Sequence, residues 1–334
     1  MLSIFDIKRV KDEFGQKLLN IPGVTGLAIA AKVTDNKKLN ELAIIVYVEK
    51  KRKPGDIPGN QLIPKQINGV NTDVIERPIL RGVHQSGSGS QPDTLQYPKL
   101  CGGINIGGGP VAGPRELGTL STIAYDRSDP PIFKAIVSRH VAAPRVAWNP
   151  GDPLFRPGDS YNIVAQLEAV ALYTRDTVLP IDAALAHIID QNNILCQIAE
   201  LGEVRGIIKN DQLLKMFDDA NTTGNTIHVK KRGITSGVTT GTIVAVDSGY
   251  EIGYPNDIGH VQFPDSMIEI NADSEFFSLA GDSGASILIE SNNVEESNRI
   301  IGLIVGGIRD DPRITMACHI EPICQTFGVS ICET

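Results

Sequence analysis

Residues 277–286 read Phe277-Ser278-Leu279-Ala280-Gly281-Asp282-Ser283-Gly284-Ala285-Ser286. Ser283 is the candidate nucleophile, because the glycines around it permit a tight turn. Such a turn would aim the backbone N–H groups of Gly281 and Ser283 at one point, where they could bind an oxyanion. A plain surface turn is the alternative, since Gly-Asp-Ser-Gly arises by chance in about one chain of this size in a hundred. The assignment therefore depends on partners elsewhere in the chain.

Two upstream segments supply candidates for these partners. An apolar run at residues 132–137 predicts a strand, and Ser138-Arg139-His140-Val141 follows it, which places His140 at a strand exit. Asp182 is a lone acid between apolar residues, where a buried charge is costly unless it is paired. The order His140, Asp182, Ser283 is that of a known convergent triad, in which the histidine is the base and the carboxylate orients it.

With these motifs the chain resembles the trypsin/chymotrypsin clan of serine proteases, and within it the HtrA-like and bacterial branch. It is similar above all to the trypsin-like proteins related to the plant narrow-leaf protease and their bacterial relatives. The shared segments are Gly118-Thr119-Leu120, Ser138-Arg139-His140-Val141, Ile181-Asp182-Ala183-Ala184, residues 233–241, residues 277–284 and residues 302–307. They span most of the chain after residue 100.

The resemblance implies a mainly β fold, with two antiparallel six-stranded β-barrels of the chymotrypsin type preceded by a small α/β N-terminal domain. The expected domains are residues 1–80 for the N-terminal domain, 81–100 for a flexible linker, 101–190 for the first barrel, and 191–334 for the interbarrel segment and second barrel. The triad would lie in the cleft between the barrels.

The function implied is that of a serine endopeptidase acting on a peptide or protein substrate. Ser283 would form an acyl-enzyme, with His140 as general base and Asp182 as the orienting carboxylate. By the same resemblance, Phe277 lines the base of the primary specificity pocket, and Gly306 and Gly307 lie on the strand that pairs with the substrate backbone. An aromatic residue at 277 favours a small or apolar substrate side chain over Lys or Arg.

Local patterns predict the elements of the N-terminal domain. Ile4, Ile7, Val10, Phe14 and Leu18 form one apolar stripe of a helix, with Ser3 and Asp6 as its cap. Strands are predicted at residues 24–33, 42–48 and 69–76. The Gly/Ser-rich segment 84–93 is a flexible linker by composition, and a cleft plug or autocleavage segment is the alternative.

Short strands and turns are predicted for the rest, as barrels require. The predicted strands are 117–124, 132–137, 162–172, 181–186, 226–231, 240–246, 260–263, 267–270, 285–289 and 300–308. Helices are predicted at 211–220 and 322–327.

Composition limits the other functions. The formal net charge is −8, with a positive N-terminal part that could dock on the negative remainder. The basic run Lys50-Lys51-Arg52-Lys53 is a solvated hairpin tip without a known binding fold, so no nucleic-acid partner is expected. No motif predicts a metal site or a cofactor, and no apolar run predicts a membrane partner.

An odd cysteine count and the lack of an apolar leader pattern predict a cytoplasmic protein, with a homo-oligomer possible. Two further functions stay open at this point. One is a protease-fold scaffold that binds partners with little or no turnover, and the other is an esterase-like hydrolase that uses the same triad. The partner of Asp282 is also open, because no processed N-terminal Ile-Val-Gly-Gly segment is present to pair with it.

Overall fold

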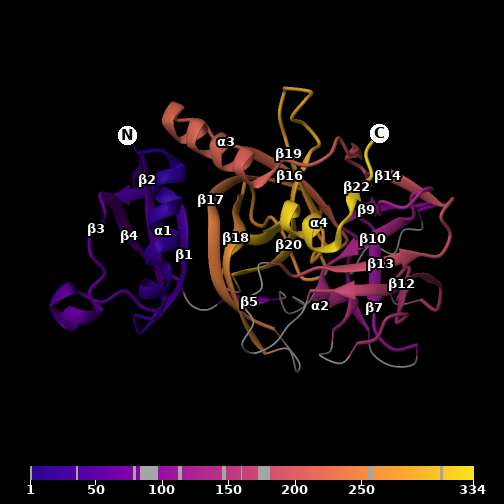
Figure 1. Ribbon diagram of the computed structural model, residues 1–334, viewed down its shortest axis with the longest axis horizontal. Helices are drawn as coiled ribbons and strands as arrows, with labels where there is room; N and C mark the ends of the chain where they lie inside the picture. Colours follow the sequence, from indigo (N-terminus) through magenta and orange to yellow (C-terminus); the bar gives the residue numbers. More distant parts are fainter. Residues whose placement is uncertain are drawn as a thin grey trace.

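The computed structural model describes residues 2–34, 37–77, 80–82, 97–111, 115–144, 148–158, 160–171, 181–254, 259–308 and 311–334. Over these residues the chain is mainly β (Figure 1). An N-terminal unit stands at one end of the molecule, a sheet that we call the first sheet stands at the other, and a closed barrel that we call the second barrel lies between them. The predicted mainly β class is confirmed.

The N-terminal unit packs one helix against a short sheet. Its elements are α1 (Ile4–Leu19), β1 (Val24–Thr34), β2 (Lys37–Val48), β3 (Gln66–Ile67) and β4 (Val70–Glu76), with two 3-10 turns at Pro54–Asp56 and Gly59–Gln61. Of the predicted apolar stripe of α1, Ile4, Ile7, Val10 and Leu18 are buried and Phe14 is half-buried, and Ser3 and Asp6 form the expected capping box. The β-branched residues of β2 pair with β1 on one side and with β4 on the other.

This unit is joined to the second barrel by a continuous sheet. Strand β1 pairs antiparallel with β17 (Gly237–Gly253). Lys11 of α1 is buried and its Nζ lies 2.8 Å from the carboxylate of Asp247 on β17. A second link runs from Tyr47 of β2, whose hydroxyl donates to Glu269 of β18 (His260–Ala272) over 2.9 Å. Because Asp247 and Glu269 are buried, leaving their charges unpaired would be costly. These contacts therefore fix the orientation in which α1 and β2 pack against the second barrel.

The second barrel has six strands, the number that the family resemblance implied. Its order is β16 (His228–Gly233), β19 (Ser286–Ile289), β20 (Ile300–Ile308), β21 (Asp311–His319), β18 and β17, and the pairing of β16 with β17 closes the ring. The short strand β5 (Leu80–Gly82) pairs with β17 and with β20. Strand β20 is buried along almost its whole length, which explains its nearly continuous apolar run.

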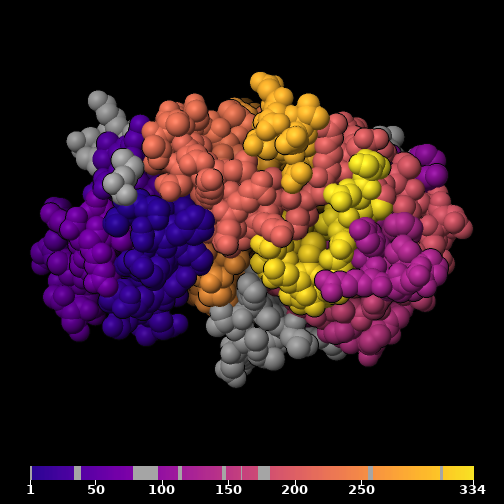
Figure 2. All heavy atoms as spheres, turned by 45° about the horizontal axis from the view of Figure 1, so that its top comes forward, coloured from indigo at the N-terminus to yellow at the C-terminus, as the bar shows by residue number. Residues whose placement is uncertain are grey.

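The first sheet contains eight strands over the described residues, two more than were predicted. Its order is β22 (Ser330–Ile331), β9 (Thr122–Tyr125), β10 (Phe133–Val137), β13 (Ala184–Ile188), β12 (Ile163–Val170), β11 (Pro153–Phe155), β7 (Asn105–Gly108) and β8 (Glu116–Thr119). A small three-stranded sheet of β6 (Leu100–Gly102), β14 (Ile194–Ile198) and β15 (Gly202–Glu203) lies beside it. After the second barrel the chain returns to the first sheet, where β22 pairs with β9 at the edge of the sheet. Figure 2 shows this C-terminal segment between the first sheet and the second barrel, which we call the two halves of the molecule.

The remaining helices are α2 (Arg139–Ala142), α3 (Asn210–Thr223) and α4 (Ile320–Phe327). The helices predicted at 211–220 and 322–327 are confirmed. Three strand predictions differ in detail: 117–124 is divided into β8 and β9 at Leu120 and Ser121, the two segments at 260–270 form one strand, and 240–246 is only the middle of β17. The strands that were not predicted are β3, β5, β6, β7, β11, β14, β15, β21 and β22. Positive φ at Ser266 marks the irregularity that made β18 look like two strands. The linker predicted at 81–100 falls mostly on residues outside the described part.

Candidate active site

His140 is positioned where a strand of the first sheet ends. Strand β10 stops at Val137, and the single turn α2 carries His140 into the interior, where only 3% of the residue is exposed. The hydroxyl of Ser138 donates to the carbonyl of Ile304 on β20 over 3.2 Å. The start of α2 is therefore tied to the second barrel, and His140 lies at the junction of the two halves.

Asp182 lies two residues before β13 and is fully buried. Its Oδ2 is 2.5 Å from Nδ1 of His140, and its Oδ1 accepts the backbone N–H of His140 over 3.2 Å. Burial alone would raise the pKa of Asp182, but attraction to His140 and the hydrogen bonds it accepts outweigh that effect and hold the pKa below its ordinary value. The two residues are thus brought together in the geometry predicted for a base and its orienting acid.

Two residues that support Asp182 were not predicted. Tyr254, which follows β17, donates its hydroxyl to Oδ2 of Asp182 over 2.8 Å, and its ring lies 5.5 Å from the ring of His140. Cys318 of β21 accepts the backbone N–H of Asp182 at its sulfur over 3.3 Å, and burial together with the charge of Asp182 raises the pKa of this thiol well above its ordinary value. Both residues come from the second barrel, so no sequence signal near Asp182 could have identified them.

Ser283 lies in a turn that joins the end of the second barrel's long hairpin to β19. We call residues 279–284 the oxyanion turn. Gly281 and Gly284 adopt φ values of 98° and 93°, which side chains with a Cβ rarely accept. The carbonyl of Ser283 accepts the backbone N–H of Thr119 on β8 over 2.8 Å, and Gly284 donates to Ile304 over 2.8 Å. The turn is therefore held against both halves of the molecule.

The same contacts bring Ser283 close to the segment that carries His140. A Cβ on Gly118 would lie 2.5 Å from the side chain of Val141 and 3.0 Å from the carbonyl of Ser283. Ser283 and His140 make no direct hydrogen bond in the described part of the chain, and the buried Nε2 of His140 has no hydrogen-bond partner there. The base nitrogen is thus left available on the side of the imidazole away from Asp182.

The two predicted oxyanion donors are also available. Among the described residues, neither the N–H of Gly281 nor that of Ser283 donates to a protein acceptor, whereas Asp282 between them donates to the carbonyl of Leu279 over 3.0 Å. The carbonyl of Gly281 accepts the hydroxyl of Thr119 over 3.0 Å. These contacts orient the peptide groups while leaving the two N–H groups unused, as an anion site requires.

Asp282 has a complete set of partners, which resolves the question left open by the sequence. Its carboxylate is fully buried and accepts the backbone N–H groups of Thr235 over 2.9 Å and Leu279 over 2.9 Å. It also accepts the N–H and hydroxyl of Ser236, and it pairs with Nζ of Lys231 on β16 over 3.2 Å. An internal lysine therefore supplies the counterion of this acid.

The residues predicted to bind substrate lie in different surroundings. Phe277 is fully buried, its ring belongs to the core of the second barrel, and Nζ of Lys231 lies 6.0 Å from the ring centroid. Gly306 and Gly307 are on β20, and there the backbone of β5 pairs with them in antiparallel register. A segment of the chain itself thus occupies the strand edge predicted for a substrate.

Glu116 of β8 is a further acid near the imidazole. Burial raises the pKa of Glu116, and attraction to His140 offsets part of that rise. No sequence motif marks this residue as functional.

Other parts of the described chain offer different features. No group of three or more His, Cys, Asp or Glu side chains lies close enough there to hold a metal ion, and no helix is long and apolar enough to cross a membrane.

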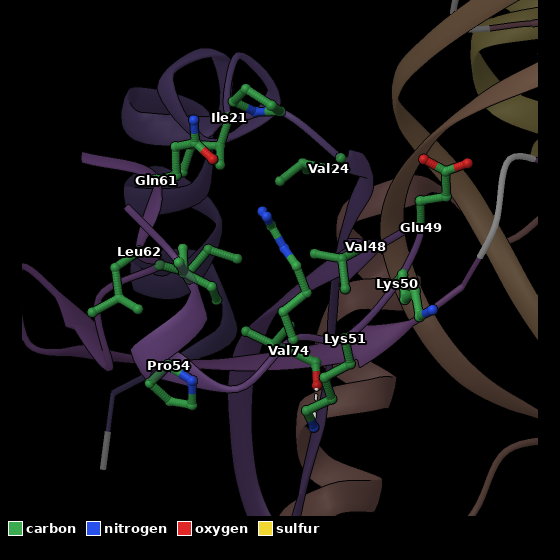
Figure 3. A pocket seen from close by; sticks show the side chains of 15 residues that line it. Ile21, Val24, Val48, Glu49, Lys50, Lys51, Pro54, Gln61, Leu62 and Val74 are labelled. Carbon is green, nitrogen blue, oxygen red and sulfur yellow. Dashed lines mark hydrogen bonds between the residues drawn. The ribbon is translucent and has the colours of Figure 1, made fainter. Parts of the chain in front are cut away.

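Cys196 and Cys332 form a disulfide, although the odd cysteine count did not predict a complete disulfide framework. A cavity of about 330 Å³ lies in the N-terminal unit, where Figure 3 shows Gln61 and Leu62 on one side and Val24 and Val48 on the other.

Comparisons with known proteins agree with the resemblance seen in the sequence. The sequence model of the family described as the Nal1 C-terminal domain matches residues 159–333. Protein NARROW LEAF 1 of Oryza sativa subsp. japonica is 24% identical over 359 aligned positions, which cover 98% of this chain and 58% of that protein. The chain thus spans less than two thirds of this relative. The predicted similarity to the plant narrow-leaf proteins is confirmed.

Solved structures with a related arrangement are serine proteases. A glutamic acid specific serine protease is 15% identical, with 70% of this chain and 100% of that chain covered and a TM-score of 0.46. Thermobifida fusca protease A is 15% identical, with 70% and 98% covered and a TM-score of 0.44. Cellulomonas bogoriensis chymotrypsin is 18% identical, with 70% and 98% covered and a TM-score of 0.42. Identities and scores of this size do not assign an activity.

Proposed function

We propose that this chain, which belongs to the Nal1 C-terminal domain family, is a serine endopeptidase. The observation that carries the proposal is the 2.5 Å contact between Nδ1 of His140 and Asp182, combined with an Nε2 that has no partner in the described chain. A carboxylate at Nδ1 fixes the proton there and leaves the lone pair of Nε2 free to act as a base. Ser283 is the proposed nucleophile, supported by the contacts of its backbone carbonyl with the strand that packs on Val141.

The proposed reaction has two steps. Oγ of Ser283 attacks the peptide carbonyl carbon while Nε2 of His140 takes the hydroxyl proton, and the negative charge on the substrate oxygen is stabilised by the N–H groups of Gly281 and Ser283. The tetrahedral intermediate then expels the amine, which receives its proton from the imidazolium. Water, activated by the same base, hydrolyses the acyl-enzyme and restores Ser283. Asp182 stabilises the imidazolium in both steps.

Substrate selection is the second part of the proposal. We assign Phe277, Gly306 and Gly307 to the substrate-binding side, with a small or apolar residue preferred at the primary position. Because β5 pairs with Gly306 and Gly307, a peptide that uses this edge has to displace β5 or bind beside it. Cleavage of Arg or Lys chromogenic substrates ahead of Ala, Val or Leu substrates would contradict this assignment.

The pairing of β5 also favours a second candidate, a scaffold that keeps the protease fold and binds partners with little or no turnover. An occupied substrate edge and the lack of a direct bond between Ser283 and His140 both suit that reading. An esterase-like hydrolase needs the triad but not the strand edge, and turnover of acyl esters without peptide cleavage would identify it.

A cytoplasmic location and self-association are also parts of the proposal. The Cys196–Cys332 disulfide counts against a reducing compartment, where such bonds are rare. Quenching cells in acid, alkylating the free thiols under denaturing conditions and counting them by mass spectrometry decides the matter: three labelled cysteines indicate an oxidised pair, and five indicate a reducing location.

The deciding experiment is intact-mass spectrometry after treatment with a fluorophosphonate, with Ser283→Ala as the control. A single adduct on Ser283 that is absent from the control supports a competent nucleophile, and peptide profiling then separates peptidase from esterase. Lack of any adduct between pH 6 and 9 at about millimolar reagent would contradict the enzyme and favour the scaffold.

A further inference from the structure

The residue before the candidate nucleophile is an acid with an unusual number of partners. The carboxylate of Asp282 accepts hydrogen bonds from three backbone N–H groups, one hydroxyl and one ammonium, and it is fully buried. One of the N–H groups belongs to Leu279 in the oxyanion turn, and two belong to the hairpin turn of Thr235 and Ser236. Asp282 therefore joins two turns that are far apart in the sequence.

The ammonium of Lys231 is surrounded by hydrogen-bond acceptors, one of which is the carboxylate of Asp282. It is fully buried on β16, and its Nζ contacts Oδ2 of Asp282 at 3.2 Å, the carbonyl of Gly237 at 3.1 Å and the hydroxyl of Ser236. An ammonium has three N–H donors, so every donor has an acceptor. Among the described residues, Lys231 is the only cation in an ion pair with Asp282.

The space around the pair is tight. A Cβ on Gly233 would lie 2.2 Å from Oδ1 of Asp282, and a Cβ on Gly281 would lie 2.4 Å from the hydroxyl oxygen of Thr235. That hydroxyl donates to the carbonyl of Ala280 over 2.5 Å. The peptide group that carries the N–H of Gly281 is thus fixed by the same hairpin turn that Lys231 contacts.

We propose that Lys231 is the positioning residue of the oxyanion turn: its buried ammonium fixes Asp282 and so keeps the N–H groups of Gly281 and Ser283 aimed at one point, without any cleavage of the chain. The catalytic consequence rests on the proposed function, whereas the structural part does not. Removing the cation leaves the buried carboxylate of Asp282 without a counterion, which is costly. Asp282 would then move toward solvent and displace the oxyanion turn.

The first test measures the turn itself. Lys231→Met keeps the length and apolar stem of the side chain, and Lys230→Met is the matched control, because Lys230 is the neighbouring lysine of the same strand and makes no ion pair among the described residues. Hydrogen exchange should become about tenfold faster or more in peptides covering residues 233–237 and 279–285 of Lys231→Met, and stay unchanged in Lys230→Met. Equal exchange in the two variants would overturn the proposal.

The second test measures reactivity. Fluorophosphonate labelling of Ser283 should be about a hundredfold to a thousandfold slower in folded Lys231→Met than in the wild type, as expected when an oxyanion donor is misplaced. If the wild type is labelled and Lys231→Met is labelled equally fast, the positioning role is wrong and the protease function stands. If the wild type is not labelled but the turn still loosens in Lys231→Met, the proposed function fails and the structural role of Lys231 stands.

A pH profile covers the case in which Lys231→Met does not fold. Burial lowers the pKa of Lys231 below its ordinary value of 10.5, and Asp282 offsets part of this effect. The charged groups facing its ammonium are Asp282 from the turn and Arg232 from its own strand. In the wild type, the hydrogen-exchange rate of the turn, corrected for the intrinsic rate, should increase as the pH is raised toward 10.5 and should return to its starting value when the pH is lowered again. Lys231→Arg should abolish this increase, because arginine keeps its charge over this range. A flat wild-type profile would contradict the proposal.

Discussion

The two sides of the candidate site each contain a buried carboxylate, and the two are satisfied differently. On the side of the first sheet, Asp182 accepts from the imidazole, the backbone of His140 and the hydroxyl of Tyr254. On the side of the second barrel, Asp282 is paired with Lys231. Within the described residues, Asp182 has no lysine or arginine partner.

This difference matches what each acid has to do. A permanent cation beside Asp182 would cancel the charge that is needed to stabilise an imidazolium. A lysine beside Asp282 neutralises an acid that lies one residue from the nucleophile, so that acid does not compete for the proton of Ser283. The charge of Asp182 is thus available to stabilise the imidazolium of His140, whereas the carboxylate of Asp282 holds the backbone of the oxyanion turn in place. Four predictions test this division.

The largest effect is expected from Asp182→Asn. An amide at this position cannot accept the Nδ1 proton and also stabilise the imidazolium, so the labelling rate of Ser283 should fall about ten-thousand-fold. The oxyanion turn should keep wild-type hydrogen exchange, because its contacts come from other residues. Stopped-flow or timed labelling gives the rate, and a loss smaller than tenfold would remove Asp182 from the proposed mechanism.

Gly233→Ala should disturb the other carboxylate. The new Cβ would lie 2.2 Å from Oδ1 of Asp282 and displace it, so labelling should slow about a hundredfold while the His140–Asp182 contact is kept. Gly55→Ala, in the N-terminal unit, is the control because nothing lies within 4 Å of the new atom and its φ is not positive. Equal labelling of the two variants would argue against a role for Asp282.

Tyr254→Phe removes one donor from Asp182 and should reduce labelling about threefold to tenfold. It should also change the pH dependence of stability. The pKa of Asp182 is lowered from 3.8, so its contribution to folding is present above that pH and is lost as the pH falls through the lowered value. Losing the hydrogen bond raises this pKa again. The difference in unfolding free energy between wild type and variant should therefore be largest near pH 7 and narrow below pH 3.8, as measured by urea titration.

The smallest effect on the site is expected from Tyr47→Phe in the N-terminal unit. The variant loses the 2.9 Å hydrogen bond to Glu269, while Tyr250 still donates to this carboxylate over 2.6 Å. Stability should fall by about 1 kcal/mol, and the labelling rate of the folded protein should not change. Denaturant melts and labelling of the same samples check both; a slower labelling rate would mean that the N-terminal unit acts on the site.

Sequence patterns predicted the parts of this molecule that depend on neighbouring residues. The stripe of α1 has the period of a helix, so burial of one face could be predicted directly. The apolar runs of β10 and β20 are short and nearly continuous, which predicts strands buried on both faces. The expectation that Asp182 is paired follows from the cost of burying a lone charge. The same cost of burial indicates that Asp282 needs a partner, but it does not identify which residue that is.

The supporting residues could not be predicted, because they depend on pairing between distant strands. Lys230 and Lys231 are adjacent, and successive side chains of a strand point to opposite faces, so only the register of β16 shows which lysine is buried. Tyr254 reaches Asp182 across a separation of 72 residues. Strand β21 was missed because Pro312 and Arg313 interrupt its apolar pattern near its start.

The return of β22 to the edge of β9 constrains when this protein can fold during synthesis. Ser330 and Ile331 pair with Tyr125 and Ala124, and Cys332 donates to Ile123, so the first sheet lacks its edge until a segment about two hundred residues further along has left the ribosome. Strand β1 likewise waits for β17. When Ser283 has been synthesised, β19, β20 and β21 of the second barrel and β22 of the first sheet are still to come, so both sheets are incomplete and the site is not yet assembled.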